Sequence, residues 1–267
     1  MPGDGHRPQT VASRGIEEYK EQTAPPCCEA RVATQLLLEI TVESLDAALA
    51  AERGGADRIE LCAELAVGGV TPNVAAMRKV HEELEIPVFP MIRPRAGNFV
   101  YTDAEFAAMK RDISVARDLG VDGIVLGILR PDSSVDVERT GELVDWARPL
   151  EVTFHRAFDE TADFFRSLED VIECEAARIL TSGGAKTATE GADTLRRLVQ
   201  AAAGRIVIMP GGGLTASNIV KVVAETRAVE FHSGLGSVLP YGSSNLQRFE
   251  AEIHSMKRYM NGRALSA

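Results

Sequence analysis

Short apolar runs alternate with longer amphipathic stretches along most of the chain, beginning at Leu36. The short runs have the length of buried strands, and the longer stretches repeat their apolar positions at helical spacing. The predicted strands are Leu36–Thr41, Arg58–Cys62, Val88–Arg93, Gly123–Ile128, Glu151–His155, Arg178–Thr181, Arg205–Met209 and Val229–His232. Predicted helices include Ser44–Arg53, Asp103–Leu119, Thr187–Ala202, Ser217–Glu225 and Ser243–Tyr259. Eight regular strand–helix units favour a closed parallel (β/α)8 TIM barrel over an open doubly wound sheet.

Two further patterns fit this architecture. Similar turns precede every second strand, at residues 55–60, 120–125 and more loosely 175–180, so the repeat unit is two strand–helix pairs. Helix starts are marked by Thr71-Pro72, by capping boxes at Thr102/Glu105 and Thr187/Glu190, and by Thr215 as an N-cap.

The first 31 residues differ from the rest, because they are rich in proline, glycine and charge without a sustained apolar period. We interpret residues 1–31 as a flexible tail and residues 32–267 as one barrel domain. Cys27 and Cys28 lie in this tail, with no second pair at metal-ligand spacing, which favours two solvated thiols.

Composition narrows the functional classes. The chain of 267 residues carries a formal net charge of −10, which argues against a broad basic face for nucleic acid or anionic lipid. No apolar run approaches the roughly 20 residues of a membrane helix, and the N-terminus lacks the apolar segment of a signal peptide. Four cysteines in so long a chain do not form a disulfide framework. We therefore expect a cytoplasmic protein in a reducing compartment.

Charged side chains gather at the carboxyl ends of the predicted strands, the face where TIM barrels place their chemistry. Strand alternation assigns six of them to the barrel interior: Glu39, Glu60, Arg93, His155, Glu230 and His232. Burying such groups without partners costs several kcal/mol each. They therefore form either an ion network that fills the barrel or a ligand site, and the two glycine loops nearby favour a ligand site.

An anionic ligand would suit this mouth. The run Arg205–Thr215 passes from an apolar strand through three glycines to a helix start, a geometry that exposes backbone N–H groups to an anion. Arginine pairs can clamp a carboxylate or phosphate. The predicted anion-binding residues are Arg93, Arg95, Arg156, Ser182, Gly183, Gly211, Gly212 and Gly213. His155, next to a carboxylate from Glu39 or Glu60, would supply acid–base catalysis.

Metal binding is the competing use of the same face. Cys62, Met91, His155 and His232 are soft or borderline ligands, and thiolate with thioether selects Cu(I). They lie far apart in sequence without a recognised ligand spacing, and buried Cys and Met are more often core residues. No predicted strand carries the lysine of a Schiff-base aldolase, and only two histidines lie on strands, too few for a zinc hydrolase.

Several long motifs together resemble the CutC copper homeostasis family. They are Gly54–Cys62 (GGADRIELC), Gly68–Pro72 (GGVTP), Met91–Arg95 (MIRPR), Val152–Asp159 (VTFHRAFD), Ile179–Gly184 (ILTSGG), Ile208–Gly213 (IMPGGG) and Glu230–His232 (EFH). The resemblance implies a TIM barrel that is cytoplasmic and sometimes nuclear, usually a homo-oligomer (dimer or tetramer), with a link to copper tolerance and Cu(I) binding.

The resemblance also implies individual roles and departures. Cys62 falls on a cysteine that the family presents as a copper ligand, whereas Thr41 stands where a second such cysteine is common. After His232 the chain reads Ser-Gly-Leu-Gly, where the family tends to read Ser-Ala-Arg. Three readings remain: a copper homeostasis protein that binds Cu(I), an enzyme that acts on a small anionic substrate by acid–base chemistry, and a non-catalytic oligomeric scaffold.

Overall fold

The computed structural model describes residues 35–236 and 245–264, and within them strands and helices alternate as predicted. The strands are β1 (Leu37–Val42), β2 (Arg58–Leu61), β3 (Val88–Pro90), β4 (Gly123–Leu126), β5 (Glu151–Phe154), β6 (Arg178–Thr181), β7 (Val207–Pro210) and β8 (Glu230–Ser233). The helices are α1 (Leu45–Arg53), α2 (Val74–Glu83), α3 (Asp103–Leu119), α4 (Val137–Ala147), α5 (Phe164–Glu173), α6 (Ala192–Ala202), α7 (Ile219–Thr226) and α8 (Leu246–Ala264). Short 3-10 turns η1 (Leu65–Val67) and η2 (Arg156–Glu160) follow β2 and β5.

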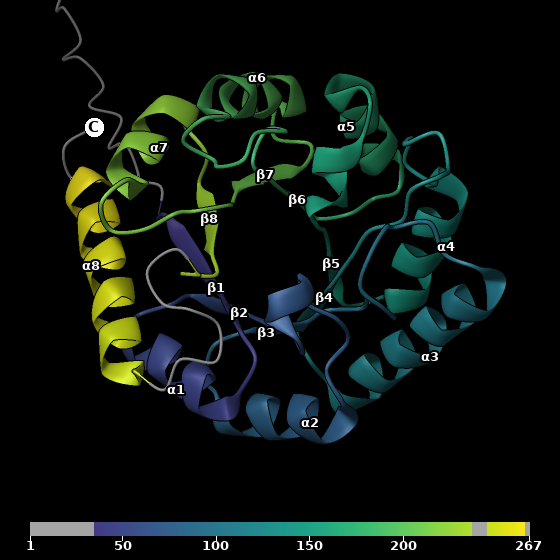
Figure 1. Ribbon diagram of the computed structural model, residues 1–267, viewed down its shortest axis with the longest axis horizontal. Helices are drawn as coiled ribbons and strands as arrows, with labels where there is room; N and C mark the ends of the chain where they lie inside the picture. The colour runs from purple at the N-terminus through teal and green to yellow at the C-terminus, as the bar shows by residue number, and fades with distance from the viewer. Residues whose placement is uncertain (1–34, 237–244, 265–267) are drawn as a thin grey trace, which may run out of the picture. The chain divides into compact units, whose positions relative to one another are not determined.

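The strands form a closed parallel barrel. Ladders join β3-β2-β1-β8 and β4-β5-β6-β7, and single parallel bridges, Met91 to Val125 and Gly211 to His232, connect the two groups. Figure 1 shows the strands at the centre and the helices in a ring around them. The predicted (β/α)8 TIM barrel is confirmed.

Alternation along each strand separates an apolar outer layer from a polar interior. Leu38, Ile59, Phe154 and Phe231 are fully buried and belong to one large apolar cluster with residues of the surrounding helices. Their neighbours on the same strands, such as Glu39, are just as buried but face the barrel axis. The fold therefore concentrates buried charge inside the barrel, where it needs partners.

Several predicted boundaries were wrong, each for a local reason. Strand β3 ends at Pro90, because Arg93 N–H donates to Thr71 Oγ1 (2.9 Å) instead of to the ladder. Helix α6 begins at Ala192, since Thr187 accepts a hydrogen bond from Glu190 N–H in a separate turn.

The predicted N-cap of the following helix was also wrong. Helix α7 begins at Ile219 with Asn218 at its N-cap, and the Asn218 side chain accepts from Thr215 N–H (2.9 Å). The three glycines of residues 211–213 therefore lead into a turn, and the helix begins only afterwards.

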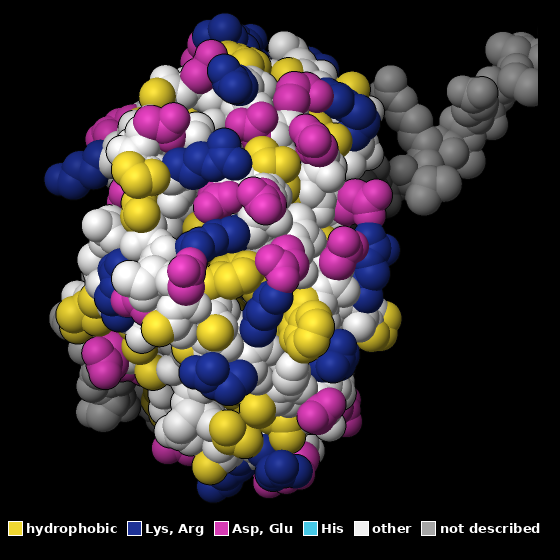
Figure 2. Space-filling model, turned by 90° about the vertical axis from the view of Figure 1, so that its right-hand side faces the viewer, with side chains coloured by type: hydrophobic (Ala, Val, Ile, Leu, Met, Phe, Trp, Pro, Cys, Tyr) yellow, Lys and Arg dark blue, Asp and Glu magenta, His cyan; other side chains and the backbone are white. Residues whose placement is uncertain are grey.

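Other predictions concern the surface and the termini. The capping box of Thr102 and Glu105 is present at the start of α3. In Figure 2, acidic and basic side chains are interspersed over the visible face. No helix in the described ranges is long and apolar enough to cross a membrane. The predicted tail, residues 1–31, lies outside the described residues.

Candidate functional site

A cavity of about 420 Å³ opens at the carboxyl ends of the strands, which is the functional face of TIM barrels. Its volume suits a small molecule. The lining residues that carry the argument are Glu60, Cys62, Met91, Arg93, His155, Arg156, Lys186, Gly212, Gly213 and His232, together with Thr41 and Phe99. Most predicted site residues therefore converge on one cavity.

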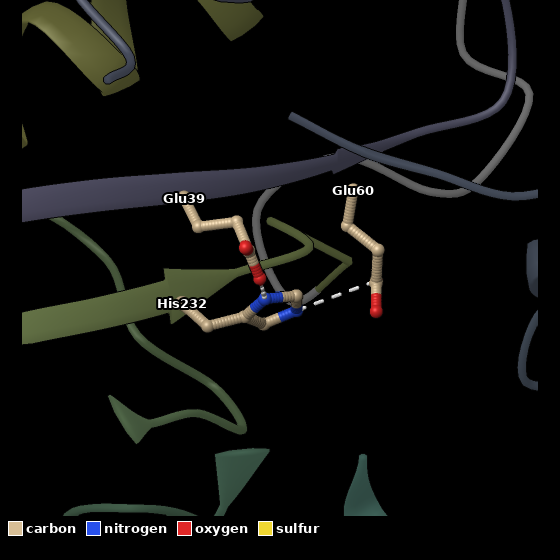
Figure 3. Close-up of side chains that lie close together, drawn as sticks. All are labelled: Glu39, Glu60 and His232. Carbon is tan, nitrogen blue, oxygen red and sulfur yellow. Dashed lines mark hydrogen bonds and ion pairs between the residues drawn. The ribbon is translucent and has the colours of Figure 1, made fainter. Parts of the chain in front are cut away.

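Polar side chains of β1, β2 and β8 meet at one side of this cavity, and Figure 3 shows His232 between the carboxylates of Glu39 and Glu60. Thr41 Oγ1 donates to Glu60 Oε2 (2.7 Å) and contacts His232 Nε2 (2.8 Å). His232 Nδ1 lies 2.6 Å from Glu39 Oε1. When Glu60 is ionised, the single hydroxyl proton of Thr41 points to Glu60, so His232 Nε2 donates to Thr41 and Nδ1 donates to the Glu39 carboxylate. In that state both ring nitrogens of His232 carry protons.

The charges agree with this assignment. Burial opposes the imidazolium of His232, but Glu60 and Glu39 outweigh it and raise the pKa of His232. Burial likewise opposes ionisation of Glu39, and Arg58 and His232 overcome it, so that the pKa of Glu39 falls to about 2. For Glu60 burial prevails, helped by Glu39, and raises its pKa.

The two carboxylates thus differ in their access to a ligand. Glu39 is 1% exposed, is held by Arg58 as well as His232 and lies outside the cavity lining, so its acid–base role stays a prediction. Glu60 lines the cavity, and its Oε1 atom has no hydrogen-bond partner in the described chain. Glu60 is the carboxyl group that can meet a ligand.

A second layer of ion pairs lies deeper in the barrel, and its arginines, Arg58 and Arg178, were not among the predicted site residues. Arg58 Nη2 donates to Glu230 Oε2 (2.7 Å), and Arg178 Nε donates to the same oxygen (3.1 Å). Both guanidinium groups also lie about 5 Å from the Phe89 ring, at 5.0 and 5.2 Å. Alternation already placed Arg58 on the face of Glu60, so that signal was available in the sequence.

His155 differs from its predicted role. Its Nδ1 accepts a hydrogen bond from Ala157 N–H (3.1 Å) at the start of η2, so the proton of the neutral ring is on Nε2. Burial and then Arg93 lower the pKa of His155 to about 3. No carboxylate pairs with it in the described residues. His155 thus lacks the carboxylate partner that we expected, and its Nε2 holds the proton. Its roles as an acid–base residue and as a metal ligand stay predictions.

Arg93 and Arg95, which we predicted to clamp an anion, direct most of their N–H groups to the chain itself. Arg93 uses Nη1 to donate to the Gly68 and Gly69 carbonyls (3.1 and 2.9 Å) and Nη2 to donate to the Gly97 carbonyl (2.7 Å). Its Nε atom has no partner among the described residues. Arg95 lies outside the cavity lining, where it pairs with Glu105 (2.6 Å).

The glycine loop after β6 already holds an anion of the chain itself. Asp159 accepts hydrogen bonds from Ser182 N–H (3.0 Å), Gly184 N–H (3.1 Å) and the Thr181 hydroxyl (2.5 Å). Gly183 N–H donates to Thr181 Oγ1 (2.9 Å). This loop surrounds an internal carboxylate, and the binding of an external anion at Ser182 and Gly183 stays a prediction.

The loop after β7 is different, because its glycines line the cavity. Gly212 and Gly213 have φ values of 100° and 72°, a region that favours glycine. A Cβ on Gly212 would lie 3.4 Å from Arg156 Nη1, so this end of the guanidinium group lies next to the loop. Lys186 also lines the cavity and forms no ion pair within the described ranges. Gly211 itself is engaged with Thr181 and β8.

Soft metal donors remain on the opposite wall. Cys62 and Met91 belong to one small buried cluster and both line the cavity. Burial, and after it Glu60, raises the pKa of the Cys62 thiol. Donor atoms of Glu39, Glu60 and His232 lie within 4.8 Å of one another, but His232 has no free lone pair in the bonding pattern above. His232 as a metal ligand stays a prediction.

Known proteins share both sequence and fold with this chain. A family model described as the CutC family matches residues 36–237. A human protein named copper homeostasis protein cutC homolog is 43% identical over 229 residues, 86% of this chain and 84% of that protein. The mouse protein of the same name is 46% identical over 196 residues, 73% of this chain and 72% of its own length.

Solved structures give the same picture. A protein named CutC from Streptococcus agalactiae superposes with a TM-score of 0.72 and 35% identity, covering 74% of this chain and 98% of that one. Phosphoribosylanthranilate isomerase from Thermotoga maritima reaches a TM-score of 0.57 at 15% identity, over 85% of this chain and all of that one. The latter likeness shows a common barrel fold only.

Proposed function

The chain belongs to the CutC family, and from this membership we propose that it acts in copper homeostasis by binding Cu(I) at the wall of the barrel-mouth cavity. The support comes from the names of its relatives and from the pairing of Cys62 with Met91 in one cluster. A thiolate and a thioether are the ligands that Cu(I) prefers.

The bonding pattern restricts this site to few ligands. Thr41 offers a hydroxyl where the family commonly has a second cysteine, and that hydroxyl is bonded to Glu60 and His232. Cu(I) would therefore bind Cys62 and Met91 and displace the thiol proton. Since burial raises the thiol pKa, binding should weaken as pH falls.

The experiment is a Cu(I) titration against a competing chelator under reducing conditions. We expect Cys62→Ser to abolish and Met91→Leu to weaken the bound equivalent. Cys174→Ser is the matched control, because Cys174 is also a buried free thiol but lies at the end of α5. Equal Cu(I) affinity in wild type and Cys62→Ser would refute the site.

A second function is favoured by one specific observation. Glu60 Oε1, Arg93 Nε and His155 Nε2 are buried at the cavity without partners among the described residues. Such atoms are costly unless a ligand or water satisfies them. We propose that the cavity also binds a small anionic substrate, with Arg156, Lys186 and the Gly212–Gly213 loop holding the anion and Glu60 exchanging a proton.

This second function is tested by calorimetric titration with inorganic phosphate. We expect Arg156→Ala to weaken phosphate binding about tenfold or more, as for loss of a charge-assisted hydrogen bond. Arg148→Ala is the control, because Arg148 pairs with Asp145 and Glu175 at the surface and lies outside the cavity lining. Identical phosphate binding in the wild type and both variants would refute an anion site at Arg156.

Cellular location and assembly belong to the same proposal. We place the protein in the cytoplasm, and also in the nucleus as the resemblance implies, where the free thiols of Cys62 and Cys174 would stay reduced. We further propose a homo-oligomer, dimer or tetramer. Native mass spectrometry would test it, and a monomer at micromolar concentration would refute it.

A further inference from the structure

Two of the unpartnered atoms at the cavity are obligate hydrogen-bond donors. Arg93 Nε always carries a proton, and His155 Nε2 carries one because Nδ1 accepts from Ala157 N–H. The two side chains are 5% and 4% exposed. Neither donor has an acceptor in the described chain, which leaves two buried N–H groups that call for an oxygen atom.

The side chains of Arg93 and His155 are both held in place by their neighbours. The Phe99 ring lies 4.8 Å from the Arg93 guanidinium and 4.8 Å from the His155 ring centroid. The three carbonyls that bind Arg93 Nη1 and Nη2 fix the plane of its guanidinium. The His155 ring also packs tightly against Gly127, because a Cβ on that glycine would come within 2.6 Å of the imidazole. Neither donor can turn away without disrupting these contacts.

We propose that Arg93 Nε–H and His155 Nε2–H together bind a carboxylate oxygen of the ligand, opposite the subsite formed by Arg156 and the Gly212–Gly213 loop. This inference rests on the proposed binding of a small anionic substrate and specifies its class. A cationic donor beside a neutral one favours an oxygen that bears negative charge. The ligand is therefore a short molecule with a carboxylate at one end and a phosphate, or a second carboxylate, at the other.

The test compares two compounds that differ at one end, 3-phosphoglycerate and glycerol 3-phosphate, by calorimetric titration of the full chain. The first carries a carboxylate where the second carries a hydroxymethyl group. We expect wild type to prefer 3-phosphoglycerate by about tenfold or more, from two added hydrogen bonds to a charged group.

Two variants of His155 separate the donor from the ring. His155→Phe keeps an aromatic ring on Phe99 but lacks the Nε2–H, so the preference should fall to about twofold while glycerol 3-phosphate binds as before. His155→Gln places an amide N–H near the position of Nε2 and should retain most of the preference. If His155 had only a structural role, both variants would weaken the binding of the two compounds equally. Circular dichroism checks that each variant folds.

The outcomes distinguish this inference from the function on which it rests. If both compounds bind equally, and Arg156→Ala weakens both, the anion site stands and the carboxylate subsite is refuted. If His155→Phe keeps the full preference, the subsite is likewise refuted. If neither compound binds wild type, both proposals fail together.

Discussion

Replacing Glu39 by Gln removes the carboxylate that joins two cations inside the barrel. Glu39 Oε2 accepts from Arg58 Nε (2.5 Å), and Oε1 accepts from the protonated Nδ1 of His232 (2.6 Å). The amide of Gln has one acceptor oxygen for these two donors, and its NH2 group would face one of them. Because the site is buried, water cannot compensate.

The magnitude follows from the pKa of Glu39. A decrease from the ordinary 4.5 to about 2 corresponds by linkage to about 3 kcal/mol of folding free energy at neutral pH. Breaking one partner of a buried ion pair is expected to lose about 3–5 kcal/mol. Both routes predict that Glu39→Gln loses about 3 kcal/mol of unfolding free energy at pH 7.

The direction of the pKa shift determines how the stability difference between wild type and Glu39→Gln depends on pH. Since folding lowers the pKa of Glu39, its stabilisation is complete above about pH 4.5 and is lost as pH falls toward 2. Gln does not titrate, so the difference between wild type and variant should be largest at pH 7 and shrink below about pH 4.5.

Urea unfolding at several pH values, followed by circular dichroism, measures this difference. Glu105→Gln serves as the control, because Glu105 pairs with Arg95 where both side chains are partly exposed, and it should lose less than about 1 kcal/mol. The reasoning fails if Glu39→Gln costs no more than this control, or if its effect is the same at pH 7 and pH 3.5.

Three further predictions concern single positions away from this pair. Gly141→Ala should stabilise the fold by about 1 kcal/mol in urea unfolding, because a Cβ there meets nothing within 4 Å and alanine favours the α4 helix. Gly123→Ala should destabilise it by about 2 kcal/mol or more in the same assay, since its Cβ would lie 2.4 Å from an aromatic ring and 2.7 Å from a carbonyl oxygen. Cys62 of the folded protein should react with iodoacetamide far more slowly than the same thiol in the unfolded chain, because burial and Glu60 raise its pKa. In the Glu60→Gln variant Cys62 should react faster than in wild type. Peptide mapping checks this rate, with Cys174 as internal reference; an unchanged rate in Glu60→Gln would contradict the assigned cause.

The spacing of apolar residues along the chain and the alternation of side chains along each strand were sufficient to predict the barrel and the inward face of its strands. They placed Glu60, Cys62 and His232 on the interior, and all three line the cavity. What they could not supply is which hydrogen bonds each polar group makes. Whether Arg93 donates to a ligand or to backbone carbonyls depends on how the loops after β2 and β3 fold, and no residue pattern encodes that.

The same limit applies to the tautomer of His155. Its proton is placed by one backbone N–H two residues ahead, in a 3-10 turn that the sequence pattern did not predict. By contrast, Arg58 and Arg178 follow from alternation once the strand starts are known, because each begins its strand on the inward face. Both lie at the amino ends of their strands, away from the carboxyl ends where a TIM-barrel site is expected.

In the loop after β6, the carboxylate of Asp159 competes with any dissolved anion, because it belongs to the same chain. A group attached to the same domain has an effective concentration in the millimolar range or above. The Asp159 carboxylate accepts from two backbone N–H groups, from the hydroxyls of Thr181 and Ser182 and from Arg156 Nε. A dissolved phosphate at micromolar concentration cannot displace it. The two glycine loops at the barrel mouth therefore differ: the loop after β6 binds a carboxylate of its own chain, whereas Gly212 and Gly213 of the loop after β7 line the cavity.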